Sequence, residues 1–90
     1  MFVTAEGSPG AIFWRAIQRE NVIMAETVAR EFPVLPLDYA LALVHLYGRK
    51  KDSRYERAAL RYLERYIAEA NPTLLDVAGV AGLLAERKGA

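Results

Sequence analysis

The basic side chains between residues 49 and 65 are the group whose type and spacing could bind another molecule. Four arginines recur at intervals of three or four residues, which places them on one face of a helix. Three further basic residues precede them. The seven residues are Arg49, Lys50, Lys51, Arg54, Arg57, Arg61 and Arg65. Such a face could contact the phosphates of a nucleic acid or an acidic protein partner.

Acidic residues in the same stretch favour another interpretation, a solvated helix face with ion pairs between neighbouring turns. Glu64, one of four acidic residues among the arginines, is within one turn of both Arg61 and Arg65. The formal net charge of the chain is only +1, which argues against a strongly polyanionic partner. We expect the solvated face and keep nucleic-acid binding as the alternative.

Residues for catalysis or metal binding are scarce. The chain has no cysteine, and His45 is its single histidine. A histidine can transfer protons or sense pH, but Asp38 lies seven residues away, about 10 Å along a helix, too far for a hydrogen bond. No cluster has the spacing of a metal site or a phosphate-binding glycine loop. We therefore expect no enzymatic activity, no metal and no cofactor.

Small residues form a second candidate surface near the end of the chain. Ala78, Gly79 and Gly82 lie close together on the last expected helix, and Leu83 falls on its polar side. Each glycine inside a helix costs about 1 kcal/mol relative to alanine, so a close approach of another backbone should offset this cost. That backbone could belong to a second copy of the chain or to the central helix, and both explanations stay open.

Aromatic residues also recur at helical spacing, at Tyr55, Tyr62 and Tyr66. They could form a platform on which bases stack. We expect instead that they form the buried seam of an amphipathic helix, with hydroxyl groups reaching its boundary.

The elements that carry these residues are all expected to be helical. The four prolines fall between periodic segments, as they do where helices begin and end. The fold class is thus all-α, a bundle of four to five helices arranged as helical hairpins. The expected helices cover residues 9–20, 21–32, 37–48, 53–70 and 73–87. Residues 8–88 form a single expected domain, and residues 1–7 are expected to be frayed or disordered.

The helix at 37–48 is expected to be the buried centre of the bundle, because apolar residues occupy nearly every side of it. Gly48 would end this helix in the left-handed conformation. A helix-turn-helix that uses residues 37–47 to read DNA is excluded, since a reading helix must present polar side chains to base edges.

Three capping signals mark helix starts. Ser8 precedes Pro9, and the pairs Ser53–Glu56 and Thr73–Asp76 each have the spacing of a capping box. Residues 9–32 could form one helix, or two helices with Asn21 as the cap of the second. We favour the break at Asn21.

The function expected from these features is that of a helical protein–protein interaction module or accessory subunit, with a homodimer as one form. Apolar residues slightly exceed the roughly 45–50% of ordinary soluble domains, and a partner could cover the excess. No run approaches the roughly 20 apolar residues of a membrane span. Residues 1–10 lack the basic start and apolar run of a signal peptide, so a cytoplasmic location is expected.

Overall fold

Five helices and no strand make up residues 8–88, the part of the chain that the computed structural model describes. The helices are α1 (Pro9–Gln18), α2 (Val22–Ala29), α3 (Leu37–Arg49), α4 (Tyr55–Ala70) and α5 (Leu74–Lys88). The all-α expectation is confirmed, and each helix begins and ends within a few residues of its expected bounds. The expectation for residues 1–7 lies outside the described residues.

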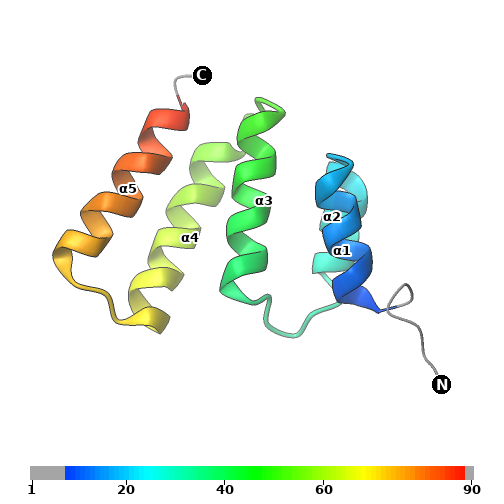
Figure 1. The fold of residues 1–90 in the computed structure, drawn as a ribbon, viewed down its shortest axis with the longest axis horizontal. Coiled ribbons are helices and arrows are strands. Elements are labelled where there is room, and N and C mark those ends of the chain that lie inside the picture. The colour runs from blue at the N-terminus through cyan, green and yellow to red at the C-terminus, as the bar shows by residue number, and fades with distance from the viewer. Residues whose placement is uncertain (1–7, 89–90) are drawn as a thin grey trace.

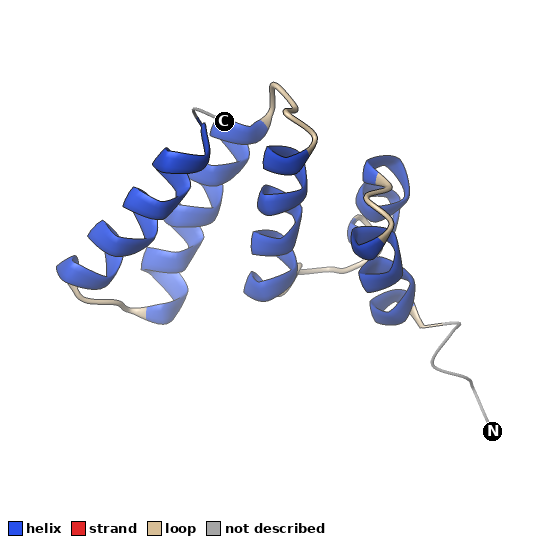
Figure 2. Ribbon diagram, turned by 45° about the horizontal axis from the view of Figure 1, so that its top comes forward, coloured by secondary structure: helices blue, strands red, loops and turns tan. Residues whose placement is uncertain are grey.

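The helices form a thin array rather than a round bundle. The hairpin of α1 and α2 packs on one side of α3, and α4 packs on the other, with α5 at the far edge (Figures 1 and 2). The molecule measures 45 × 29 × 16 Å. The α1–α2 hairpin overlaps in the view down the shortest axis, whereas α3, α4 and α5 lie side by side (Figure 1). The helix at the edge, α5, therefore has one side packed and the opposite side open.

The central position of α3 explains why its sequence is apolar on opposite sides. Leu46 packs with Phe13, Ala16, Ala25 and Val28 in a core shared with the α1–α2 hairpin. A second core lies on the α4 and α5 side of α3. Its buried members are Val44, Tyr47, Tyr55, Ala59, Tyr62 and Leu84. Many α3 side chains between these cores are only half-buried.

The first stretch is two helices, as favoured from the sequence. Glu20 takes the left-handed conformation with φ 56°. The N–H of Asn21 then donates to the Ala16 carbonyl at 2.9 Å, and the N–H of Glu20 donates to the Ile17 carbonyl. These two bonds close the end of α1 as a Schellman motif. The Asn21 side chain caps α2 by accepting a bond from the N–H of Met24 at 3.1 Å.

The end of α3 uses the same motif, but not at the glycine that the sequence suggested. Gly48 lies inside the helix, and Lys51 has the positive φ of 53°. The N–H of Asp52 donates to the Tyr47 carbonyl at 2.9 Å. The expectation for Gly48 is therefore wrong, because α3 extends to Arg49 and the chain reverses two residues later.

The capping box expected from Ser53 and Glu56 is also wrong. Helix α4 begins at Tyr55, and its N-cap residue Arg54 makes no side-chain capping bond. The Asp52 carboxylate accepts bonds from both the backbone N–H and the guanidinium of Arg54. The turn at Lys51 places Asp52, rather than Ser53, where it can organise the start of α4.

The other two caps form as expected. The Ser8 hydroxyl accepts a bond from the N–H of Ala11 at 3.1 Å. Thr73 and Asp76 make the full capping box, because each side chain accepts a bond from the other residue's N–H at 3.1 Å. The start of α5 is thus fixed by its own sequence.

Two large apolar side chains near the end of α4 and the start of α5 are exposed. Leu74 is 86% exposed and Ile67 is 50% exposed. Both lie near the 70–74 connection, where α4 ends and α5 begins. Helix α5 packs on α4 through Val80 and Leu84, so its first turn extends beyond the packed region. No described helix is long and apolar enough to cross a membrane.

Candidate functional site

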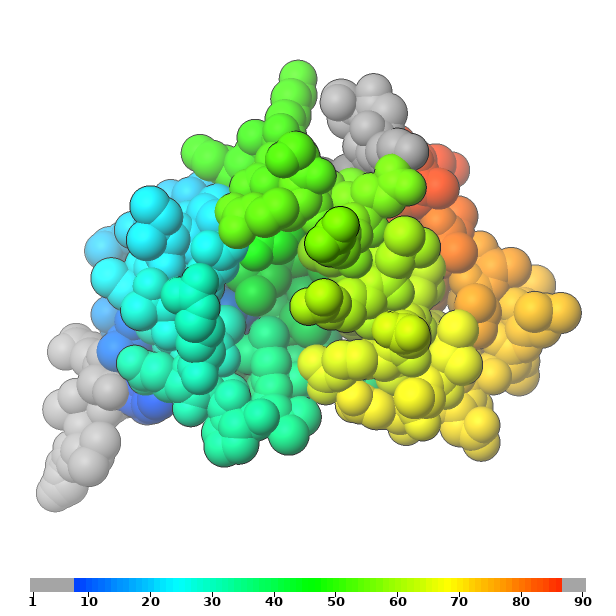
Figure 3. Space-filling model, turned by 180° about the vertical axis from the view of Figure 1, so that it is seen from behind, coloured from blue at the N-terminus to red at the C-terminus, as the bar shows by residue number. Residues whose placement is uncertain are grey.

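A groove runs between α3 and α4 and is closed at one end by the segment that joins α2 to α3. Its apolar floor is formed by Leu35, Ala40, Leu43, Val44, Ala58 and Tyr62. Its volume is about 340 Å³, at the lower end of the range found for ligand-binding clefts. In the view from behind, the surface is hollowed between the cyan α2 side and the yellow-green α4 segment (Figure 3).

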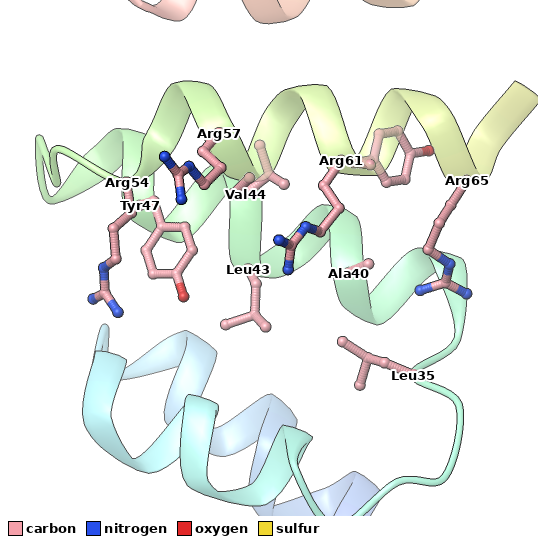
Figure 4. Close-up of a pocket in the computed structure, with 11 residues that line it drawn as sticks. Leu35, Ala40, Leu43, Val44, Tyr47, Arg54, Arg57, Arg61 and Arg65 are labelled. Carbon is pink, nitrogen blue, oxygen red and sulfur yellow. The ribbon is translucent and has the colours of Figure 1, made fainter.

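Four of the seven predicted basic residues line this groove. Arg57, Arg61 and Arg65 project from α4 along one edge of it, beside side chains of α3, and Arg54 extends the row from the N-cap position of α4 (Figure 4). They share this edge because their spacing repeats with the helix and because the opposite side of α4 supplies the core residues Tyr55 and Ala59.

The other three basic residues do not join the row. Arg49 is the last residue of α3 and pairs with Glu20 at 3.2 Å. Lys50 and Lys51 lie exposed in the turn that follows. The sequence placed seven cations on one surface, whereas the groove has four.

Arg54, at one end of the row, has acidic partners on this chain. It lies 2.7 Å from the Glu26 carboxylate of α2 and makes a two-point contact with Asp52 at 2.9 and 3.0 Å. Its guanidinium carbon lies 4.8 Å from the centre of the Tyr47 ring. Hydrogen bonds from the Arg54 side chain and backbone lower the pKa of Asp52 to about 2.

The Tyr47 hydroxyl donates a hydrogen bond to the same Glu26 carboxylate. Burial, and then this contact with Glu26, raises the pKa of Tyr47 to about 12. The phenol is therefore neutral at physiological pH and acts as a donor, not as a base or nucleophile. This end of the groove is built to hold α2, α3 and α4 together.

Arg65, at the other end, also has an internal partner. It pairs with Glu69 one turn later at 2.8 Å, rather than with Glu64, the neighbour that the sequence suggested. Between these ends, Arg57 and Arg61 are exposed and make no ion pair with any described side chain. The middle of the groove thus has two uncompensated positive charges above an apolar floor.

The predicted glycine surface lies on the open side of α5. A Cβ atom added at Gly79 or at Gly82 would meet nothing within 4 Å. Packing against the central helix therefore does not explain these glycines. Ala78 is exposed beside them, and Leu75 and Leu83 on the same helix are 81% and 69% exposed.

The tyrosines form a seam, as expected, and not a stacking platform. Tyr55 and Tyr62 are buried, and the Tyr55 hydroxyl donates to the Leu84 carbonyl at 2.7 Å. Tyr66 is half-buried and stacks on Tyr62 with a centroid separation of 6.0 Å. The hydroxyl of Tyr55 thus joins α4 to α5, and the two rings that stack do so on each other.

His45 is half-buried on α3, and Asp38 is exposed at the start of that helix, where its carboxylate accepts a bond from the N–H of Tyr39. Within the described part of the chain, no group of histidine and acidic side chains could hold a metal ion.

Sequence reasoning missed the residues that make the arginine row into a groove. Leu35 lies in a connector, and Glu26 is 28 residues before Arg54, so no local spacing relates either one to the row. Comparisons of the chain with protein-family models, with curated proteins and with solved structures find no match.

Proposed function

We propose that this chain is a small helical protein–protein interaction module, or accessory subunit, which forms a homodimer through the open side of α5. The observation that carries the proposal is the combination of exposed leucines and unexplained glycines on this helix. We place the module in the cytoplasm, as expected from the sequence, and assign it no catalytic role.

The composition of α5 supports an apolar contact. Residues 77–85 contain no charged side chain, and Asp76 and Glu86 bound this stretch. Leu75 and Leu83 are mostly exposed at opposite ends of it. An exposed apolar patch of this kind on a small protein is typical of an interaction site.

The face is also complementary to itself. Gly79 lies midway between Leu75 and Leu83, so a twofold axis through Gly79 brings Leu75 of one copy against Leu83 of the other. The glycines at the crossing allow two backbones to approach closely, since they have no side chain there. Asp76 and Glu86 then face no acidic residue of the second α5. A twofold contact uses the same patch on both copies, and this patch meets that requirement.

A contact formed by one helix from each copy lies at the small end of specific interfaces. We therefore expect a dimer that dissociates in the micromolar range, on the order of 10–100 µM. Sedimentation velocity at concentrations on both sides of this range tests the proposal directly.

The decisive variant is the double change Leu75→Glu and Leu83→Glu, which places acidic groups on the face of both copies. It should leave a monomer at every concentration tested. Ile23→Glu is the matched control, because Ile23 is 77% exposed on α2, far from α5; it should dimerise like the wild type. A wild type that stays monomeric at several times the expected constant, about 500 µM, would overturn the proposal, as would an equal loss in the control.

A further inference from the structure

We infer that the groove between α3 and α4 binds an amphipathic helix of a different protein, one with two acidic residues a turn apart beside an apolar stripe. The inference rests on the proposed role as an interaction module, but it concerns a surface separate from α5.

The floor of the groove requires an apolar occupant. Leu35, Ala40 and Leu43 line it and are only half-buried. Contact of these apolar side chains with water is unfavourable, and covering them would stabilise a complex. An occupant with a row of apolar side chains would cover them, whereas a purely ionic ligand would not.

The edge of the groove requires negative charge at its centre. Arg54 and Arg65 at the ends already have acidic partners on this chain, while Arg57 and Arg61 have none among the described side chains. The two free arginines are four residues apart on α4, about 6 Å along its axis. Two carboxylates separated by one helical turn in the occupant would match that spacing.

The length of the groove fits a helix. Arg54, the N-cap residue of α4, and Arg65 are eleven residues apart, a span of about 16 Å. An occupant with three helical turns would extend along the whole row. Placing the apolar face of a helix in such a groove, with anchors at positions i, i+3 or i+4, and i+7, is an established mode of peptide recognition.

A second copy of this chain does not fit the groove. None of the five helices carries two acidic residues three or four positions apart. The occupant must therefore come from another protein.

A nucleic acid fits less well than an acidic helix. Its phosphates would satisfy Arg57 and Arg61, but they would leave the apolar floor uncovered. The tyrosines that could stack on bases are packed inside the protein: Tyr47 and Tyr62 are buried. The groove thus favours a protein helix, and nucleic-acid binding becomes an outcome of the experiment.

The experiment uses the full chain and fluorescein-labelled peptides of about sixteen residues, with leucines on one face and two glutamates at i, i+3 or i, i+4 along its edge. One control peptide has lysines in place of the glutamates. Another has the same composition in an order that destroys the apolar face. A single-stranded and a duplex DNA oligonucleotide complete the set. Fluorescence anisotropy is measured at low and moderate salt.

We expect an acidic amphipathic peptide to bind and both control peptides to bind at least about tenfold more weakly. The double change Arg57→Glu and Arg61→Glu should weaken binding by a similar factor and should improve binding of the lysine peptide. The matched control is Arg19→Glu with Arg30→Glu, two exposed arginines outside the groove, and it should change the affinity less than about twofold.

Three results would overturn the inference. They are no binding of any acidic peptide at about 1 mM, equal binding of the scrambled peptide, and tighter binding of DNA that is lost in the Arg57 and Arg61 variant. The Leu75 and Leu83 variant should bind the peptide like the wild type. A result that contradicts peptide binding in the groove can therefore be distinguished from a result that contradicts the α5 dimer.

Discussion

The Arg54 guanidinium lies 2.7 Å from the Glu26 carboxylate, so one ion pair joins α4 to α2 across the end of α3. The Tyr47 hydroxyl of α3 donates to the same carboxylate. The Glu26 side chain is largely covered, whereas that of Arg54 is half exposed. The contact thus places a partly buried acceptor at the point where three helices meet. It also holds one end of the arginine row in place.

Replacing Glu26 by alanine should destabilise the fold more than replacing Tyr47 by phenylalanine. The alanine leaves the partly buried Tyr47 hydroxyl without its acceptor and Arg54 without one of its partners, which together cost about 1–3 kcal/mol. The phenylalanine removes the donor and leaves the carboxylate with Arg54, at about 0.5–1.5 kcal/mol. Urea unfolding of the two variants and the wild type at pH 7 measures both values. Equal unfolding free energies in all three proteins would contradict a structural role for the contact.

Lowering the pH should remove the contribution of Asp52 to the free energy of unfolding, and it should do so over a defined pH range. The bonds from Arg54 lower its pKa from 3.8 to about 2. A carboxyl group whose pKa is lower in the folded state stabilises the fold above its unfolded pKa, and this contribution is lost as the pH falls through the folded pKa. The stability difference between the wild type and Asp52→Asn should therefore be constant above about pH 5 and should shrink between about pH 4 and 2. A difference that stays constant down to pH 2 would show that Arg54 does not stabilise the charged carboxylate.

The helix positions could be predicted because each depends on residues close in the sequence. Asn21 and Met24, or Thr73 and Asp76, are three residues apart, and their side chains cap the helices wherever the rest of the chain lies. The failed cap at Ser53 has an equally local cause. The reversal at Lys51 gives Asp52 the contact with Arg54, and the spacing of Ser53 and Glu56 contains no information on that reversal.

The groove could be predicted only in part. The spacing of Arg57 and Arg61 follows from the helical repeat and was evident in the sequence. The sequence did not indicate which arginines stay unpaired, since the partner of Arg54 is Glu26 from another helix. The exposure of Leu74 is likewise set by how far α5 extends along α4. Such long-range contacts depend on the packing of whole helices, which spacing along the chain does not determine.

Lys51 offers a test of the turn between α3 and α4. Its φ of 53° is unfavourable for a residue with a side chain, so Lys51→Gly should raise the free energy of unfolding by about 0.5–1 kcal/mol. Lys50→Gly is the matched control, because the adjacent Lys50 has a φ of −88°, and it should give no such increase. Thermal and urea unfolding report the change. A Lys51→Gly protein less stable than the wild type would contradict the left-handed conformation.

Replacing Gly79 by alanine separates the effect of this glycine on the folded monomer from its effect on the contact between two copies. A Cβ at this position meets nothing within the chain, so Gly79→Ala should stabilise the dilute monomer by about 0.5–1 kcal/mol through helix propensity. The same methyl group at the proposed crossing point should weaken dimerisation, because two backbones could no longer approach as closely. Gly10→Ala is the contrasting variant, since its Cβ would lie 2.8 Å from the Tyr39 hydroxyl; it should not stabilise the monomer. Urea unfolding at protein concentrations below the dissociation constant of the dimer measures the stability of the monomer. Sedimentation velocity at concentrations above that constant measures dimerisation. Loss of monomer stability in Gly79→Ala would show that the glycine serves the fold, and unchanged dimerisation would move the crossing point away from Gly79.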